Sequence, residues 1–232
     1  MNRLSERVFL LLVGFLVATP VMADNCSISK STIDKLQATL DAIAQSGNGG
    51  IFTPNRMWSA VVDRKGVLCS VINNDADAWP GSRAIAMAKA NAANAFSATG
   101  LALSTANLYS LTQPANGNLA PTGGVPAGSL YGLNNSNPFN ADNLAQKPDV
   151  GQVVGGIITF GGGVPLYQGG QVIGGLGVSG DSACADHAIA YRMRALAGLN
   201  GTPNNDNIVY LAIGELPNGF KHPHCLASDI TP

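Results

Sequence analysis

The chain has 232 residues, a formal net charge of −1 and only 12% charged side chains. This composition excludes a nucleic-acid-binding surface, because such surfaces need a basic stripe that the chain does not provide. The length is sufficient for one domain with a substantial hydrophobic core. Many small residues, 28 of them glycine, predict close packing of elements and surface buried between subunits.

The N-terminal segment, residues 1–23, has the features of an export signal peptide. Arg3 and Arg7 provide its basic region, and Val8–Val17 is an apolar core too short for a stable membrane span. Cleavage at its end leaves residues 24–232 as a single domain, periplasmic or secreted. This domain has no second long apolar run, so we expect no membrane contact after cleavage. An uncleaved anchor is the alternative.

The first half of the mature chain predicts two helices around a hairpin. Ser27–Ser46 reads as a helix, because its apolar residues recur at spacings of three and four. Trp58–Val62 and Val67–Ile72 read as two strands joined by a short turn that ends in Gly66. Ser82–Phe96 is an alanine-rich helix whose small side chains allow it to lie close to a sheet.

A long stretch of weak periodicity, about residues 104–150, follows the second helix. Connections of this length are uncommon in compact domains, so we expect a functional lid, an oligomer arm or an irregular ordered loop. Its most apolar island, Ser129–Leu133, should dock onto the body of the protein. Gln152–Phe160 and Leu166–Val178 then provide the second set of strands.

The chain ends with a helix over Ser182–Leu199, a short strand at Ile208–Ile213 and an extended tail. Hairpins imply antiparallel pairing, and the segregated order of strands and helices favours an α+β fold. We therefore predict an antiparallel sheet covered by helices, with a long irregular insertion loop.

The four cysteines of the mature chain predict two disulfides, since the number is even and the protein is predicted to be exported. Three pairings are possible. We favour Cys26–Cys69, which would tie the first helix to a strand, and Cys184–Cys225, which would hold the tail on the last helix. A four-cysteine metal site is not expected, because the chain has no Cys-x-x-Cys pair.

Glycine is concentrated between Gly161 and Gly180, in two apolar strands that lead into the last helix. Glycine in a strand sacrifices packing, so such a run indicates that another backbone or a ligand approaches closely. The N–H groups at the start of the following helix are candidates for holding an anionic group.

Several segments resemble, in their order and spacing, the GlcG/HbpS family of haem-binding proteins, which carry the haem-degrading-domain label. The resemblance covers about Ser31 to Leu199 and implies a profilin-like fold, a homo-oligomer and haem binding in some members. Cys184-Ala-Asp-His187 is similar to an exported, cysteine-containing branch. The segments that carry the resemblance are Ala60-Val-Val-Asp-Arg-Lys-Gly66, Ala86-Met-Ala-Lys-Ala90, Gly161-Gly-Gly-Val-Pro-Leu166 and Gly174-Gly-Leu-Gly-Val-Ser-Gly180.

We therefore expect an exported haem- or tetrapyrrole-binding protein with haem as its cofactor. Haem iron needs an axial donor, and His187 follows the glycine-rich strand directly. His187 is the predicted metal ligand, with a hydrogen-bonded structural histidine as the alternative. Lys89 either contacts the ligand or extends to solvent or an acidic partner. The predicted ligand-binding residues are His187, Lys89, Ser179, Gly180, Ser182 and Tyr167, the last as an alternative iron donor.

A second candidate site is the segment His222-Pro-His224-Cys225, in which two imidazoles and a sulfur lie close in sequence. Proline favours an extended backbone at the residue before it, so the two imidazoles can converge on a surface ion. A Cys225 that forms a disulfide is excluded as a ligand.

Two other classes of function are alternatives to haem binding. An enzyme acting on a small organic substrate would use the same pocket, with Lys89, Asp186 or His187 in acid–base roles. A structural or sensory module would instead assemble with itself and act by contact. A serine hydrolase is disfavoured, because Asp181 stands where a nucleophile elbow around Ser179 requires glycine.

Overall fold

The computed structural model describes residues 23–114, 128–133, 150–200 and 205–232. The predicted signal peptide, apart from its last residue, and most of the predicted insertion loop lie outside these ranges. Within them, no helix combines the length and the apolar character needed to cross a membrane.

A four-stranded antiparallel sheet with the strand order β2-β1-β4-β3 forms the centre of the molecule. Two hairpins, β1–β2 and β3–β4, are joined through β1 and β4, which pair from Trp58 opposite Ser179 to Asp63 opposite Gly174. The first predicted hairpin is thus confirmed, and the second hairpin forms from β3 and β4 rather than from the two predicted segments. The strands are β1 (Trp58–Asp63), β2 (Leu68–Asn73), β3 (Gly163–Gln168) and β4 (Gln171–Ser179).

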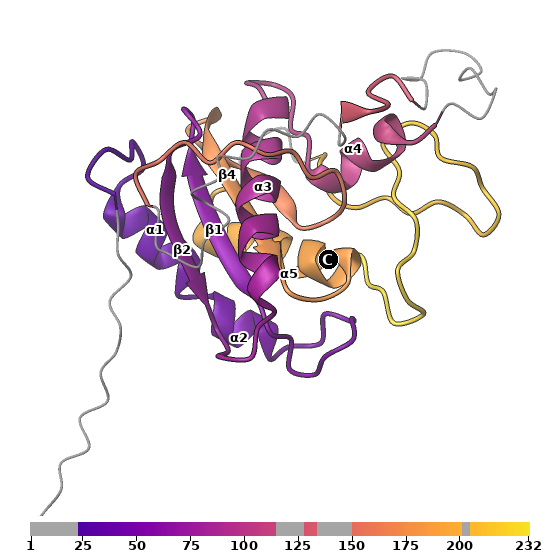
Figure 1. Cartoon of the computed structure of the whole chain (residues 1–232), viewed down its shortest axis with the longest axis horizontal. Coiled ribbons are helices and arrows are strands. Elements are labelled where there is room, and N and C mark those ends of the chain that lie inside the picture. The colour runs from indigo at the N-terminus through magenta and orange to yellow at the C-terminus, as the bar shows by residue number, and fades with distance from the viewer. Residues whose placement is uncertain (1–22, 115–127, 134–149, 201–204) are drawn as a thin grey trace, which may run out of the picture.

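Helices cover both faces of this sheet (Figure 1). One face is covered by α3 (Pro80–Phe96), which packs mainly on β4 and β1. The opposite face is covered by α1 (Lys30–Gln37), α2 (Leu40–Ala44) and α5 (Ala183–Ala197). The predicted profilin-like α+β fold, an antiparallel sheet covered by helices, is confirmed.

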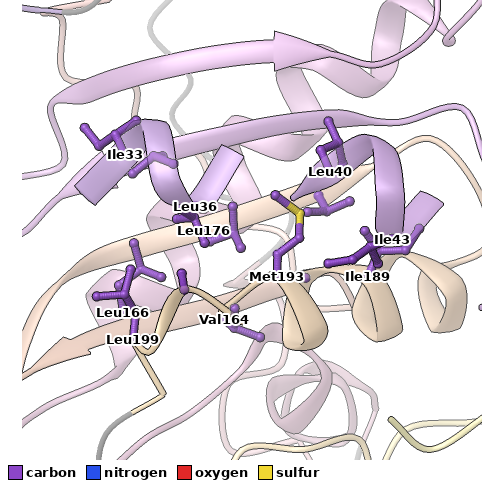
Figure 2. Close-up of a cluster of buried hydrophobic side chains, with 14 of the residues drawn as sticks. Ile33, Leu36, Leu40, Ile43, Val164, Leu166, Leu176, Ile189, Met193 and Leu199 are labelled. Atoms are coloured by element: carbon purple, nitrogen blue, oxygen red, sulfur yellow. The ribbon is translucent and has the colours of Figure 1, made fainter. Parts of the chain in front are cut away.

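The larger hydrophobic core lies between the sheet and the α1, α2 and α5 layer (Figure 2). Strand residues alternate between the two faces, so Leu176 of β4 points into this core while its neighbours Gly175 and Gly177 face α3. The helical residues of this core, all buried, are Ile33, Leu36, Leu40, Ile43, Ile189 and Met193.

The glycines of β4 allow α3 to approach the sheet at backbone distance. A Cβ atom added to Gly177 would lie 2.6 Å from Ala90 N and still closer to Ala86 O. A Cβ atom added to Gly175 would likewise clash with Ala90 O. The close approach predicted from the glycine run is therefore made by another backbone, the small-residue face of α3.

The first predicted helix, Ser27–Ser46, is wrong as a single element and consists of α1 and α2. The Thr39 hydroxyl donates a 2.7 Å hydrogen bond to Leu36 O, which competes with the helical backbone bonds at the end of α1. Both short helices still contribute to the same hydrophobic core.

The predicted strand Gln152–Phe160 is also wrong. Gly155 and Gly156 have φ angles of +64° and +78°, which an extended strand does not allow. Val153 forms an isolated bridge to Val67 and not a ladder. The strand after this segment, β3, begins at Gly163, three residues before the predicted start.

The predicted strand Ile208–Ile213 is reduced to a single bridge between Tyr210 and His222. A turn follows at once, in which Glu215 N donates to Ala212 O and Gly214 has a φ of +80°. The chain therefore leaves the extended conformation before a ladder can form.

The predicted insertion loop, residues 104–150, begins with a helix, α4 (Thr105–Thr112). Ser104 caps it, since its side chain accepts from Asn107 N and its own N–H donates to the Asn107 side chain at 2.9 Å. The apolar island Ser129–Leu133 docks on the end of α4, where Leu130 N donates to Leu111 O.

Both favoured disulfides are present, Cys26–Cys69 and Cys184–Cys225. The first joins the segment before α1 to β2. The second joins the start of α5 to the C-terminal segment, defined here as residues 205–232. No free cysteine remains.

Candidate functional site

A buried ion pair lies at the end of the sheet where β4 ends and β3 begins. Lys89 of α3 extends to Asp186 of α5, with 2.6 Å between Nζ and Oδ2, and also donates to Val178 O at 3.2 Å. The other Asp186 oxygen accepts the Asp181 N–H at 3.0 Å. The Phe160 ring lies 4.8 Å from the ammonium, within the range of a cation–π contact.

Burial dominates the electrostatics of this pair. It raises the pKa of Asp186 to about 6, although the adjacent ammonium opposes the shift. It lowers the pKa of Lys89, with the carboxylate opposing. Because the carboxylate still titrates below neutral pH and accepts a short charge-assisted hydrogen bond, the pair is ionised at neutral pH.

His187 is the next residue of α5 and is completely buried. Neither ring nitrogen has a hydrogen-bond partner within the described chain. Burial, with a contribution from His222, lowers its pKa to about 3, and the nearby Asn207 amide opposes this shift without reaching hydrogen-bonding geometry. The ring stacks on Tyr191 at 5.9 Å between centroids. His187 is therefore a neutral imidazole that no residue of the described chain meets in hydrogen-bonding geometry.

The C-terminal segment covers α5 and α4 (Figure 1). Ile208 packs against Ala106 of α4 and Cys184 of α5. His222 is buried, and its Nε2 accepts the Gly161 N–H at 3.2 Å. Since Asn207 and His222 are also the groups that act on the His187 pKa, this segment lies over the part of α5 that carries His187.

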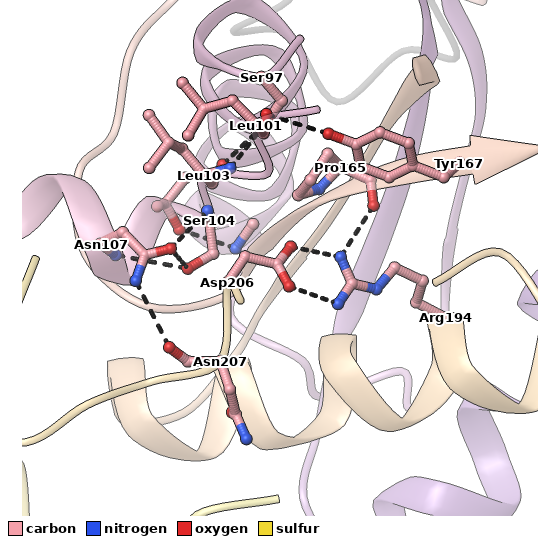
Figure 3. A network of polar contacts seen from close by, with 12 residues as sticks. Ser97, Leu101, Leu103, Ser104, Asn107, Pro165, Tyr167, Arg194, Asp206 and Asn207 are labelled. Carbon is pink, nitrogen blue, oxygen red and sulfur yellow. Dashed lines mark hydrogen bonds and ion pairs between the residues drawn. The ribbon is translucent and has the colours of Figure 1, made fainter. Parts of the chain in front are cut away.

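The beginning of the C-terminal segment is held by a buried ion pair (Figure 3). Arg194 of α5 bonds both carboxylate oxygens of Asp206 and donates to Pro165 O at 3.1 Å. Tyr167, in the same network, places its hydroxyl 2.8 Å from Ala98 O and 3.0 Å from Leu101 O. The Tyr167 hydroxyl is therefore engaged within the protein.

The other predicted ligand-binding residues have local structural partners. Gly180 packs against the Met57 backbone, since an added Cβ would lie 2.9 Å from Met57 Cα. Ser182 is the N-cap of α5, and its hydroxyl accepts the Ala185 N–H at 3.3 Å. Ser179 is buried at the end of β4, opposite Trp58. The structure thus brings Lys89 and His187 to one end of the sheet, and among the described residues neither lines the hollows beside α5 or on the C-terminal segment.

Most N–H groups at the start of α5 are bonded within the protein, which disfavours an anion site there. Ser182 N donates to Asp181 Oδ1 at 2.6 Å, and Cys184 N donates to Cys225 Sγ at 3.2 Å. With the Ser182 hydroxyl bonded to Ala185 N, these donors are satisfied internally.

The predicted metal site at residues 222–225 is not formed. Cys184, His222 and Cys225 do have potential ligand atoms within 4.8 Å of one another, but both sulfurs belong to a disulfide. Cysteine binds a metal as its thiolate, which a disulfide does not offer. Of the His222 nitrogens, Nδ1 lies 2.7 Å from Pro223 O and Nε2 accepts from Gly161 N. Burial lowers the His222 pKa to about 4.

Two of the surface hollows in the described chain lie beside α5 and on the C-terminal segment. One, of about 640 Å³, lies between α2 and α5. The other, of about 460 Å³, lies on the C-terminal segment and is lined by Ile213, His224, Cys225, Leu226, Ala227 and Asp229. Neither contains a residue of the predicted ligand-binding set. His224 was a sequence candidate as part of a metal site and as a fallback haem donor, but nothing in the sequence pointed to its carboxylate neighbour, Asp229.

Comparison with known families gives one match over most of the sheet and its helices. The family described as "Haem degrading protein HbpS-like" matches residues 53–195, which include Lys89, Asp186 and His187. The C-terminal segment lies beyond the matched residues. No curated protein sequence matches the chain.

Two solved structures have a similar fold. Klebsiella pneumoniae protein ORFY, a DUF336 protein, is 24% identical with a TM-score of 0.52, over 74% of this chain and 90% of its own. A PduOC:heme complex is 25% identical with a TM-score of 0.51, over 73% of this chain and 94% of its own. Both support the fold assignment.

Proposed function

The chain belongs to the HbpS-like family of haem degrading proteins, and from this premise we propose that it is an exported haem- or tetrapyrrole-binding protein. Haem is named in the similar PduOC:heme complex, which supports the same ligand class here. Two disulfides and the features of residues 1–23 support export to the periplasm or the exterior. The predicted homo-oligomer and the enzyme and assembly-module alternatives stay predictions.

The observation that carries this function is the buried imidazole of His187. A buried polar group without a hydrogen bond costs stability, so an unpartnered imidazole in a core needs a reason. Bound haem would supply an iron with an open axial position for a neutral nitrogen donor. We therefore assign the axial role to His187, which lies within the family-matched residues, whereas His222 and His224 do not.

The residues around His187 act by holding it in place. The Lys89–Asp186 ion pair fixes α3 to the start of α5 and keeps the residue next to His187 in place. Gly161 allows the backbone of its loop to lie close to His187, because a Cβ atom at residue 161 would be only 3.0 Å from His187 Cβ. Asn207 and His222 of the C-terminal segment lie close enough to His187 to act on its pKa, so we infer that haem reaches His187 when this segment moves aside.

Hemin titration of the oxidised protein, followed by its Soret band after long equilibration, tests this function. The matched variant is His187→Leu, which keeps a similar volume and removes the donor. We expect a saturable Soret shift in the wild type, and a loss of the His187-dependent component in the variant. Wild type that shows no shift would overturn haem binding. An identical titration by the variant would overturn the role of His187 only.

A further inference from the structure

His224 is the exposed histidine of the C-terminal segment, and its side chain is 52% exposed. It lies outside the family-matched residues and outside the region that contains His187. Nothing in the described chain bonds its Nε2. Neighbouring residues contact its other ring nitrogen, Nδ1, and one face of its ring, and apolar side chains lie beside it.

The ring nitrogen Nδ1 faces a buried carboxylate. It lies 3.5 Å from Asp229 Oδ2, and the Asp229 side chain is only 1% exposed. The same oxygen accepts the N–H groups of Cys225 and Leu226, which hold the carboxylate in place. The second oxygen, Oδ1, is buried and has no hydrogen-bond partner within the described chain. The carboxylate is therefore fixed, and part of its charge remains uncompensated.

A carboxylate behind one imidazole nitrogen has a known consequence for the other. It favours the tautomer with the proton on Nδ1, which leaves the Nε2 lone pair free for a metal. Metal-ligating histidines almost always have a carboxylate, a backbone carbonyl or water at their other ring nitrogen. The structure thus places a buried carboxylate beside Nδ1 of a half-exposed histidine whose Nε2 has no hydrogen-bond partner within the described chain.

The face of the His224 ring is also fixed. Tyr210 stacks on it with 4.0 Å between centroids and 14° between planes. The Tyr210 hydroxyl in turn donates to Ile230 O at 3.0 Å. Since the ring is held at one edge and one face, little side-chain entropy would be lost when Nε2 binds a ligand.

The surroundings of His224 are apolar. The hollow of about 460 Å³ beside it is lined by Ile213, Leu226 and Ala227, and Ile213 is fully exposed. Other large apolar side chains on the same segment are also exposed, namely Val209, Leu216 and Phe220. An apolar surface of this kind marks an interaction site for an apolar ligand or partner.

The number of donor atoms available at His224 favours one class of ligand over another. A bare metal ion needs three or four protein donors, and the nearest sulfur, Cys225, is in a disulfide. An iron porphyrin supplies four nitrogens itself and needs one axial donor together with apolar contacts for its ring. We propose that His224, oriented by Asp229 and Tyr210, is the axial ligand of a surface haem site on the C-terminal segment, separate from His187. This inference takes its ligand from the proposed function but does not depend on the role of His187.

Stopped-flow mixing with hemin distinguishes the two sites, because the surface site is open and His187 is covered. We expect a rapid Soret phase from His224 and a slow phase, limited by movement of the C-terminal segment, from His187. His224→Phe keeps an aromatic ring on Tyr210 but offers no nitrogen. It should abolish the rapid phase, or weaken its hemin affinity at least tenfold, and leave the slow phase unchanged. His187→Leu should do the reverse.

Metal-free protoporphyrin IX separates ligation from adsorption on the apolar surface. It should bind wild type and His224→Phe equally, and wild type more weakly than hemin binds. A rapid hemin phase that persists unchanged in His224→Phe would overturn the surface site while leaving the proposed function intact. Equal affinity of wild type for hemin and metal-free porphyrin would overturn it as well. A missing slow phase with an intact rapid phase would count against His187 alone.

Discussion

Lys89 and Asp186, 97 residues apart in sequence, form an ion pair of 2.6 Å in which neither side chain is more than 2% exposed. The pair joins α3, on one face of the sheet, to α5, on the other. A buried pair of this kind fixes the relative position of elements more than it adds net stability, because both charges have lost their hydration.

Removal of one partner should therefore be more harmful than removal of both. Lys89→Met leaves the Asp186 carboxylate buried without its counter-ion and should cost about 3–5 kcal/mol of unfolding free energy. The double variant Lys89→Met/Asp186→Leu should be more stable than Lys89→Met alone. Urea unfolding of the wild type, both single variants and the double variant measures this coupling, and additive effects would show that the pair is not energetically linked.

The pH dependence of Lys89→Met provides a second readout. The folded-state pKa of Asp186, already raised to about 6 by burial, rises further when the ammonium is removed. A raised carboxyl pKa means that the folded state binds the proton more readily than the unfolded state, so stability increases as the pH falls. The deficit of Lys89→Met relative to wild type should thus shrink between pH 7 and pH 5.

His187→Leu should stabilise the protein. At pH 7 the imidazole is neutral in both states, and the variant replaces an unpartnered buried polar group by an apolar one, a gain of about 1–3 kcal/mol. A histidine with a structural hydrogen bond would give the opposite sign. Thermal or urea unfolding at pH 7 measures this difference.

Comparing the same variant with the wild type at several pH values also tests the pKa of His187, which burial lowers to about 3. Below its ordinary pKa the unfolded wild type binds a proton that the folded state does not, so wild-type stability is lost as the pH falls from about 6.5 toward 3. The advantage of His187→Leu should therefore grow by about 2 kcal/mol at pH 5. An advantage that is independent of pH would contradict a neutral buried imidazole.

The glycines of β4 show what sequence could and could not predict. Gly175 and Gly177 indicated a close approach to the strand, and the alanine-rich helix indicated an element able to make it. Their pairing could not be derived, because a ligand would leave the same sequence pattern. Lys89 in that helix suggested an acidic partner, but a contact with Asp186 depends on chain topology rather than on local sequence.

Other features were hidden from the sequence for local reasons. The cap of α4 uses Asn107 in place of the usual glutamate or glutamine, so a helix lay unrecognised at the start of the predicted loop. His224 and Asp229 are brought together by a turn in which Asp229 accepts two backbone N–H groups. Spacing alone did not indicate that turn, whereas the hairpins and disulfides followed from strand patterns and cysteine number.

Gly177→Ala should separate α3 from the sheet. The added methyl group would lie 2.6 Å from Ala90 N and closer to Ala86 O, both in a rigid helix backbone. Overpacking of this kind costs about 1–3 kcal/mol or more, since the helix must shift as a unit. Gly81→Ala, in the first turn of the same helix with no atom within 4 Å of its Cβ, is the matched control. It should be neutral or stabilising by about 0.5–1 kcal/mol, and equal effects in urea unfolding would refute the close packing.

The two disulfides close chain segments of nearly equal length, 43 and 41 residues apart, and so provide a matched pair for testing the cover over His187. Replacing either pair by serine should cost a similar amount, about 2–4 kcal/mol, because the loop-closure entropy is nearly the same. The local consequences should differ. Cys184→Ser/Cys225→Ser frees the C-terminal segment at the start of α5, whereas Cys26→Ser/Cys69→Ser leaves that segment tied.

Hydrogen exchange of residues 205–232 should therefore quicken in Cys184→Ser/Cys225→Ser, and the slow phase of hemin binding should quicken with it. Asp206 remains paired with Arg194 in this variant, so the segment is released at one attachment and not detached. The Cys26→Ser/Cys69→Ser protein should lose comparable stability without either change. If both variants accelerate the slow phase equally, access to His187 follows global unfolding, and the C-terminal segment is not its cover.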